Sequence, residues 1–380
     1  MSALLAFDSP LRDPVTRHEV GEPIADPIAV ILHDEVTTVV GSVHEEETFA
    51  RREDVVDQFL SDVDLGRLEL EQEASLSDDF LDAEILRRAL AKLGVTSVVV
   101  PPTFRLLVAD FLRENGVEVS VDADVWSLRR RRKNPWELEA IERAQRAAET
   151  AMLVAARMLR EAEPTTDGHL RFEGEVLTAE IVREAMSTEL LTQGAESDSI
   201  LVQSGVGPMK GHDLGSGPIR RNETVIIDCF PRERRHGAYS DMTRTFVPGR
   251  PSDEVQRLHA HCREALAIAF EAIRPGRSDV FAKVAEFFHD KGYPTKLHHR
   301  GPDRMTSGFT HSLGHGVGLE IHEPPLLGIR SEELVEGDVV AVEPGLYFES
   351  VGNIRLEDTV VVTADGAERF TDPYPYDLEP

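Results

Sequence analysis

Two stretches of this chain share one pattern, in which an apolar run with strand character ends on a carboxylate. The run ETVIID ends on Asp228, and Asp241 opens the next apolar stretch thirteen residues later. The run GDVVAVE ends on Glu343, and Glu357 follows fourteen residues later. Both halves also share one order of expected elements (helix, helix, strands), which is typical of an internal duplication. The pattern predicts a pseudo-two-fold domain whose strands meet at a shared central site.

Four carboxylates that converge on one site need counter-charges. A single acid at the end of an apolar strand more often caps a loop or pairs with an arginine, but duplication weakens that interpretation. Four such acids would repel one another and take up protons unless cations neutralised them, and two divalent ions would do so. Oxygen ligands with one imidazole suit Mn²⁺, Co²⁺ or Fe²⁺ better than they suit a structural zinc site.

The stretch HSLGHGVGLEIHE carries three histidines, His311, His315 and His322, among glycines. The pair His322-Glu323 does not form a zincin motif, because no second histidine follows at the required spacing and Pro324 excludes the helix. GHGVG also lacks the third glycine of a dinucleotide-binding fingerprint. We interpret these glycines as positions where the backbone passes close to a ligand.

The charge of the chain excludes one class of partner. Asp and Glu number 69 against 41 Lys and Arg, and the net charge of -28 would repel the phosphates of nucleic acid. The cations are nearly all arginine. We interpret this composition as adaptation to high salt, where screening makes such a charge tolerable; an ordinary acidic cytosolic protein is the alternative. Lysine occurs only at Lys92, Lys133, Lys210, Lys283, Lys291 and Lys296.

Cysteine usage and hydropathy indicate a cytoplasmic protein. Cys229 and Cys262 are too few for a disulfide framework or a zinc finger. Cys229 follows Asp228 on the expected strand, so its side chain should point to the opposite face and into the core. The amino terminus has no basic region of a signal peptide, and no run reaches the roughly 18 apolar residues of a membrane span.

The chain is long enough for two domains, and the patterns change near residue 128. Residues 1–128 alternate short β-branched runs with helical periodicity, which predicts an α/β domain. Residues 129–380 form the second, α+β domain, in which Pro135 opens a long helix. FTHSLG, among other runs there, has strand character. The basic run LRRRRKNP between the domains is expected to be a solvated linker or an interdomain strip of salt bridges.

The motifs SDMTRTF, HSLGHGVGLEIHE, VEPGLY and IRLED occur in one order over residues 130 to 370. This set resembles the pita-bread metallopeptidases, which include Xaa-Pro dipeptidase (prolidase), Xaa-Pro aminopeptidase, methionine aminopeptidase and the metal-free creatinase. The resemblance implies a duplicated pita-bread catalytic domain. The preceding α/β domain resembles the amino-terminal domain of the prolidase, aminopeptidase P and creatinase branches, and that likeness implies a homodimer.

The resemblance also implies the metal ligands. Asp228 matches the first ligand, His315 the single histidine ligand, and Glu343 a further ligand. Asp241 and Glu357 match the two carboxylates that bridge a pair of metal ions. The implied cofactors are two divalent ions, with Mn²⁺ or Co²⁺ ahead of Fe²⁺ or Zn²⁺.

Further residues match the family's catalytic and substrate-binding groups. Glu343 corresponds to the general base, and His212 to the histidine that flanks the scissile amide. His322 corresponds to the group that stabilises the tetrahedral intermediate. His311 resembles a pocket histidine of the proline-specific branch, and Arg355 resembles an arginine that buttresses the site.

One segment departs from the family pattern. Where the family carries a glycine two residues after the first ligand, this chain has Phe230, and the segment from Asp228 to Asp241 holds two extra residues. The hairpin is therefore expected to be longer, with arginines at its tip. A longer turn can keep the strand register, so the ligand assignment is unaffected.

The sequence supports one leading hypothesis and leaves two alternatives. The leading one is a dinuclear metallopeptidase that removes an amino-terminal residue preceding proline, from either a dipeptide or a longer peptide. A creatinase-like hydrolase of a non-peptide C–N bond is the second hypothesis, and a full ligand set argues against it. The third is a catalytically silent binding protein on the same scaffold.

Overall fold

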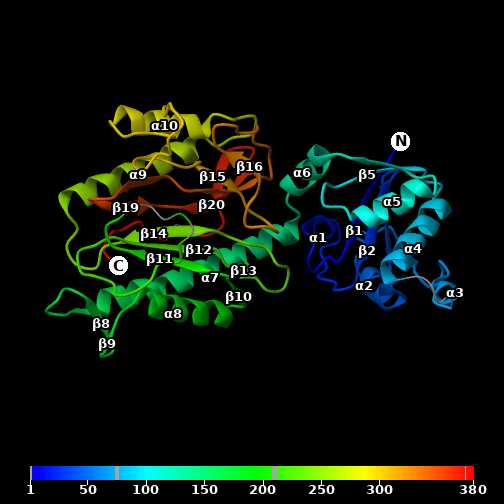
Figure 1. Ribbon diagram of the computed structural model, residues 1–380, viewed down its shortest axis with the longest axis horizontal. Coiled ribbons are helices and arrows are strands. Elements are labelled where there is room, and N and C mark those ends of the chain that lie inside the picture. The colour runs from blue at the N-terminus through cyan, green and yellow to red at the C-terminus, as the bar shows by residue number, and fades with distance from the viewer. Residues whose placement is uncertain (1, 73–76, 208–210, 212, 373) are drawn as a thin grey trace. The chain divides into compact units, whose positions relative to one another are not determined.

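The chain folds as two units, residues 1–130 and 131–380, and each is described here by itself (Figure 1). The computed structural model describes residues 2–72, 77–207, 211, 213–372 and 374–380. None of the helices within those residues combines the length and apolar composition that a membrane crossing needs.

A six-stranded sheet in the order β4-β3-β2-β1-β5-β6 forms the centre of the first unit. Strands β1 to β3 pair antiparallel, whereas β4, β5 and β6 join their neighbours in parallel. The strands are β1 Ala3–Asp8, β2 Ile28–His33, β3 Val36–Gly41, β4 Gln58–Ser61, β5 Ser97–Val100 and β6 Glu118–Val121. The helices are α1 Pro14–Val20, the 3-10 turn η1 Val43–Glu45, α2 Glu46–Phe49, α3 Arg67–Leu70, α4 Asp78–Lys92, α5 Leu106–Glu114 and α6 Ala123–Arg131.

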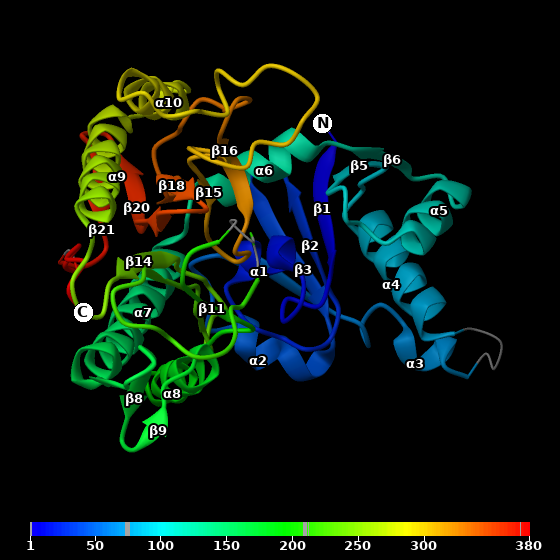
Figure 2. The ribbon, with the colours of Figure 1, turned by 60° about the vertical axis from the view of Figure 1, so that its left-hand side comes forward.

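Helices cover both faces of this sheet, because successive strand residues point to opposite sides. Leu5 and Ile31 face a core shared with α4 and α5, which lie together on one side in Figure 2. Ile28 and Val30 face the other core, where α1 contributes Val20. The α/β alternation expected from the sequence is therefore present in this unit.

The first half of the second unit begins with a long helix, as the sequence predicts. Asn134 caps α7 with a reciprocal hydrogen-bond pair to Glu137, and Pro135 is its first residue. This helix and α8 pack their apolar stripes on a three-stranded sheet in the order β11-β12-β14. The elements are α7 Pro135–Glu161, β7 Glu163–Pro164, β8 Leu170–Phe172, β9 Glu175–Val176, α8 Ala179–Thr192, β10 Ala195–Glu196, β11 Ile200–Ser204, β12 Val225–Cys229, β13 Arg232–Glu233 and β14 Met242–Phe246.

The second half repeats this order with another helix pair and another sheet. Helices α9 and α10 share a core with strands of a five-stranded sheet in the order β16-β15-β17-β20-β21 and with the hairpin of β18 and β19. The elements are α9 Asp253–Ala272, α10 Val280–Asp290, β15 Gly314–Gly316, β16 Glu323–Leu327, β17 Val339–Val342, β18 Gly345–Phe348, β19 Gly352–Arg355, β20 Asp358–Thr363 and β21 Gly366–Arg369.

Two expectations from the sequence are wrong. FTHSLG is not a strand: Phe309 makes only an isolated bridge to Thr295, and the regular pairing starts at Gly314. For the basic run, the solvated-linker alternative is wrong, since Arg131 is only 4% exposed and donates two hydrogen bonds of 2.8 Å to the carboxylate of Asp338. Pairing satisfies this buried cation within the second unit, so the arginine is structural. The run does form salt bridges, because Arg129 also pairs with Glu19 at 2.6 Å, but each of these two pairs lies within one unit.

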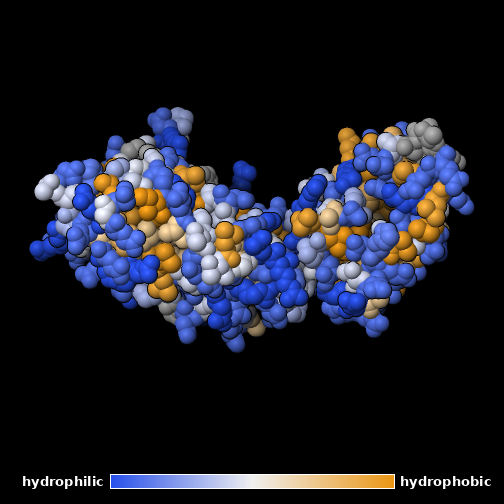
Figure 3. Space-filling view, turned by 90° about the horizontal axis from the view of Figure 1, so that it is seen from below, coloured by the Kyte–Doolittle hydropathy of each residue, from blue (hydrophilic) through white to orange (hydrophobic). Residues whose placement is uncertain are grey.

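The high-salt adaptation stays a prediction, and the net charge of -28 makes it testable. Hydrophilic residues cover most of the face seen in Figure 3. Because salt shortens the range of repulsion between exposed carboxylates, raising KCl from about 0.1 M to about 2 M should raise the melting temperature. Calorimetry at several salt concentrations measures this, and a melting temperature that stays constant or falls would contradict the prediction.

Candidate metal centre

The first carboxylate of the site lies on a buried strand. Asp228 is the fourth residue of β12, where it pairs with Leu201 on β11 and Thr243 on β14. Its neighbours in the strand are fully buried, and the side chain of Cys229 belongs to the core beneath the sheet. Alternation therefore turns Asp228 to the opposite face, as the sequence predicts, and Cys229 is a core residue.

Two further carboxylates stand immediately before the strands β14 and β20, and threonines join them. The backbone N–H of Asp241 donates to Thr359 Oγ1 at 3.0 Å, and that hydroxyl donates to the carbonyl of Asp241 at 2.9 Å. Thr243 donates its hydroxyl to the carboxylate of Glu357 at 2.6 Å, and the two residues also form a backbone bridge. These contacts hold the two halves of the duplicated unit together at the carboxylates.

One histidine completes a compact group of ligand atoms. Single ligand atoms of Asp241, His315 and Glu357 all lie within 4.8 Å of one another. His315 Nε2 is 3.7 Å from Asp241 Oδ2, while its Nδ1 is 3.1 Å from the carbonyl of Gly316. Burial lowers the pKa of His315 to about 4, so the ring is neutral and its proton sits on Nδ1. Nε2 then carries the lone pair that a metal ion requires.

Two carboxylate oxygens of this site lack a partner among the described residues. Asp228 Oδ1 and Asp241 Oδ1 are buried and accept no hydrogen bond there. Leaving a buried carboxylate oxygen unsatisfied is costly, so such atoms need an explanation. A bound cation supplies one, because carboxylate oxygens with one imidazole nitrogen are ligands that divalent ions accept. The residues therefore fit a metal centre.

The carboxylates resist ionisation without such a cation. Burial raises the pKa of Asp241 and that of Glu357 well above the usual range, and repulsion from neighbouring carboxylates adds to both rises. Burial also raises the pKa of Glu343 to about 7, although the nearby guanidinium of Arg355 opposes the rise. Uncompensated negative charge is therefore unfavourable at this site, and a proton or a metal ion that neutralises it is favoured at neutral pH.

Arg355 is the protein's own counter-charge. It is 7% exposed and lies at the end of β19. Its guanidinium donates to Asp228 Oδ2 at 2.5 Å and to the hydroxyl of Thr243 at 3.1 Å, and its Nε is 3.9 Å from Glu343. Arg355 therefore holds one carboxylate oxygen of Asp228, Oδ2, while Oδ1 has no partner among the described residues. The buttressing role stays a prediction.

The remaining predicted residues differ in their contacts. The ring of His322 stands nearly perpendicular to that of His315, with centroids 4.3 Å apart. His311 lies 2.6 Å from the carbonyl of Ser312 through Nδ1 and 2.8 Å from the hydroxyl of Tyr347 through Nε2. Burial lowers the pKa of His311 to about 3, so this ring is neutral and both nitrogens are engaged. His212 lies outside the described residues.

These groups share one pocket of about 550 Å³ in the second unit. Metal-ligating candidates line it together with apolar side chains and one lysine. The lining includes Leu201, Asp228, Phe230, Asp241, Lys296, His311, His315, Ile321, His322, Leu326, Glu343, Arg355 and Glu357. Tyr347, Thr243 and Lys296 are not among the predicted site residues. Tyr347 lies within the motif VEPGLY and Thr243 within SDMTRTF, whereas Lys296 lies in none of the four motifs.

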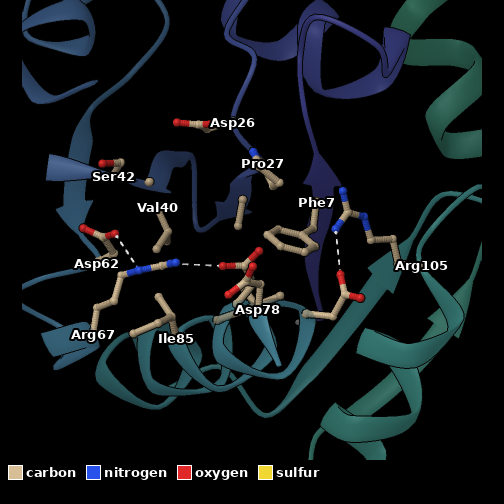
Figure 4. A pocket seen from close by; sticks show the side chains of 15 residues that line it. Phe7, Asp26, Pro27, Val40, Ser42, Asp62, Arg67, Asp78, Ile85 and Arg105 are labelled. Carbon is tan, nitrogen blue, oxygen red and sulfur yellow. Dashed lines mark hydrogen bonds and ion pairs between the residues drawn. The ribbon is translucent and has the colours of Figure 1, made fainter. Parts of the chain in front are cut away.

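The first unit has a pocket of its own, of about 420 Å³, and it is also acidic (Figure 4). Here three of the five aspartates that line the pocket have arginine partners. Arg67 lies 3.1 Å from Asp82 and 3.6 Å from Asp62, and Arg105 lies 3.7 Å from Asp79. With guanidinium groups built in as counter-charges, this cluster has less need of a metal ion than the one in the second unit.

Comparison with known proteins agrees with this geometry. The sequence pattern of metallopeptidase family M24 matches residues 139–364, and the chain belongs to this family. A Xaa-Pro dipeptidase from Pyrococcus furiosus is 33% identical over 247 residues, which are 63% of this chain and 62% of that relative. The match thus spans about three fifths of the relative's length.

Solved structures establish the fold. A prolidase from Pyrococcus horikoshii superimposes with a TM-score of 0.71 and 24% identity, covering 98% of this chain and 94% of the other. An X-Pro aminopeptidase from Thermotoga maritima gives a TM-score of 0.76 and 21% identity, covering 99% and 97%. The second unit therefore has the pita-bread fold that the sequence motifs imply, preceded by an α/β unit.

Metal affinity of this site should depend on pH. Glu343 must be ionised to bind a cation, and its pKa without metal is about 7. Below that value each bound ion must displace a proton, so affinity should fall by about tenfold per pH unit for each proton released. Titration calorimetry with Mn²⁺ at pH 6, 7 and 8, in buffers of different ionisation enthalpy, measures both the affinity for the ion and the number of protons released. An affinity independent of pH would contradict the assignment.

Proposed function

We propose that this protein is a metal-dependent peptidase that hydrolyses the bond between an amino-terminal residue and a following proline. The observation that carries the proposal is the group of Asp241, His315 and Glu357 in a pocket, with buried carboxylate oxygens left unsatisfied beside it. Membership of metallopeptidase family M24 supports the reaction class. The relative named Xaa-Pro dipeptidase supports the specificity for proline.

Five residues would hold two divalent ions, with Mn²⁺ or Co²⁺ preferred and Fe²⁺ or Zn²⁺ as the other candidates. They are Asp228, Asp241, His315, Glu343 and Glu357. Bound ions of this kind lower the pKa of water and polarise a carbonyl group. The oxygen-rich ligand set favours harder ions than a thiolate site would.

Glu343 is the proposed general base. It follows β17 directly and lies in the pocket, 3.9 Å from both His311 Nδ1 and Arg355 Nε. A carboxylate that can exchange a proton near neutral pH is suited to take one from the attacking water and return it to the leaving imide nitrogen. Arg355 opposes the rise in the pKa of Glu343 and holds Asp228 in place through a hydrogen bond.

Two histidines have separate proposed roles. His322, which stands beside His315, would donate a hydrogen bond to the oxyanion that develops on the scissile carbonyl. Both ring nitrogens of His311 already contact protein groups, the Ser312 carbonyl and the Tyr347 hydroxyl. Its proposed role is therefore to form part of the pocket wall with its ring, without a hydrogen bond to the substrate. The apolar walls at Leu201, Phe230 and Ile321 offer surfaces for the substrate's amino-terminal side chain and proline ring.

Replacing Asp241 with alanine should abolish both metal binding and hydrolysis of Ala-Pro. Asp241→Ala removes a ligand at the centre of the cluster, whereas Asp365→Ala changes an exposed acid in a turn and serves as the control. Metal content after reconstitution is measured by elemental mass spectrometry, and peptide hydrolysis by chromatography. Retained hydrolysis in Asp241→Ala would contradict the mechanism, and a wild-type protein that binds no metal would favour the silent-scaffold hypothesis.

A substrate panel separates the competing functions. The metal-loaded protein should hydrolyse Xaa-Pro peptides at least about 100-fold faster, in kcat/KM, than Met-Ala peptides, because the pocket is proposed to recognise the proline ring. Equal rates on both would argue against proline specificity. Hydrolysis of creatine, with no peptide cleaved, would support the creatinase-like alternative.

The cellular setting is proposed from the sequence alone. We expect a homodimer in the cytoplasm of an organism that lives in high salt, with a peptide as the partner and neither nucleic acid nor membrane bound. Sedimentation equilibrium tests the dimer directly.

A further inference from the structure

Among the described residues that line the pocket of the second unit, Arg355 and Lys296 are the two cations besides histidine, and they differ in their hydrogen-bond partners. The guanidinium of Arg355 already has protein partners, because it donates hydrogen bonds to Asp228, to Thr243 and, at 3.5 Å, to the hydroxyl of Tyr347. It therefore has little capacity left for a ligand. Apart from the proposed metal ions, a negative group of a substrate in this pocket must find its counter-charge elsewhere.

Lys296 lies on a segment whose backbone is well anchored. Its N–H donates to the carbonyl of Phe309 at 2.8 Å, and the N–H of Phe309 donates to the carbonyl of Pro294 at 2.9 Å. Thr295 beside it is 2% exposed, and its hydroxyl lies 2.8 Å from His298 Nδ1. The segment thus presents the half-buried Lys296 side chain to the pocket from a fixed base.

The ammonium group of Lys296 has no partner among the described residues. Within the part of the chain that the structure describes, no carboxylate forms an ion pair with it and no hydrogen bond reaches its Nζ. Two other lysines of this unit do have carboxylate partners: Lys133 pairs with Glu323, and Lys291 lies 3.5 Å from Glu264. The charge nevertheless acts inside the pocket, since it adds to the effects of burial and Arg355 that lower the pKa of His311.

We infer that Lys296 binds the free carboxylate of a substrate's carboxy-terminal proline, which makes dipeptides of the Xaa-Pro type the preferred substrates. The inference rests on the proposed function. In a dipeptide this carboxylate belongs to the residue that supplies the scissile nitrogen, so it must stay in the same pocket. In a longer peptide the same position is a neutral amide, which leaves the ammonium without an ionic partner.

The apolar lining strengthens the effect of this single charge. Leu201, Phe230, Ile321 and Leu326 line the same pocket, and apolar walls limit the water that competes for an ion pair. A lysine is a compact charge on a flexible stem, so it can follow a carboxylate whose position varies with the proline ring pucker. Lys296 is therefore a specificity-determining residue, separate from the groups that carry out hydrolysis.

The test compares a free carboxylate with a blocked one. The substrates are Ala-Pro, Ala-Pro amide and Ala-Pro-Ala, and the proteins are metal-loaded wild type, Lys296→Met, Lys296→Arg and, as a matched control on the exposed face of α10, Lys283→Met. A charge-assisted contact corresponds to about 10- to 100-fold in kcat/KM. Wild type should favour Ala-Pro over its amide by that factor.

Lys296→Met should lower kcat/KM for Ala-Pro by the same factor, mainly by raising KM. The kcat/KM for Ala-Pro amide should stay nearly unchanged. Lys296→Arg should retain most of the preference, and Lys283→Met all of it. A second readout that needs no turnover is the Kd of an Ala-Pro analogue with a reduced amide bond, and of its carboxamide, measured by calorimetry. Thermal unfolding confirms that each variant folds.

The outcomes separate this inference from the proposed function. If wild type cleaves Ala-Pro, its amide and Ala-Pro-Ala equally well, or if Lys296→Met lowers the acid and the amide alike, the carboxylate-binding role is overturned while the peptidase function stands. If the metal-loaded wild type cleaves no Xaa-Pro peptide, the proposed function fails and the inference falls with it.

Discussion

The burial of several carboxylates at the junction of two half-sheets is the constraint on which the rest of this unit depends. Asp241 is 5% exposed and Glu357 2%, and burial raises the pKa of each, with repulsion from neighbouring carboxylates adding to both rises. A protein can tolerate such a cluster only with compensating positive charge. Arg355 supplies part of it, and the unsatisfied oxygens of Asp228 and Asp241 mark where the remainder is needed.

The fold follows from holding these groups in place. Each half contributes one carboxylate at or just past the end of a strand and another just before the strand that pairs with it, so a short antiparallel pair positions two candidate ligands. Thr243 and Thr359 then join the halves through hydrogen bonds to Glu357 and to the backbone of Asp241. The proposed metal site thus lies where the two repeats meet, and its residues come from distant parts of the chain.

Local patterns in the sequence predict many of the strands, the start of α7 at Pro135 and the position of the candidate carboxylate ligands next to strands, because period-two alternation and end-of-strand acids are local properties. Contacts between distant segments cannot be predicted in this way. The pairing of Arg131 with Asp338 and the contact of Thr243 with Glu357 join residues more than 100 positions apart. Lys296 cannot be predicted locally either, since only the fold shows that it lines the pocket and has no ion-pair partner among the described residues.

The central claim is that divalent ions replace the missing counter-charge at Asp241, His315 and Glu357. Anomalous X-ray diffraction from crystals of the Mn²⁺-loaded protein tests this directly. The account predicts strong anomalous peaks about 2.0–2.5 Å from His315 Nε2 and from carboxylate oxygens of Asp241 and Glu357. A map with no peak there, while these carboxylates pair with protein cations, would contradict it.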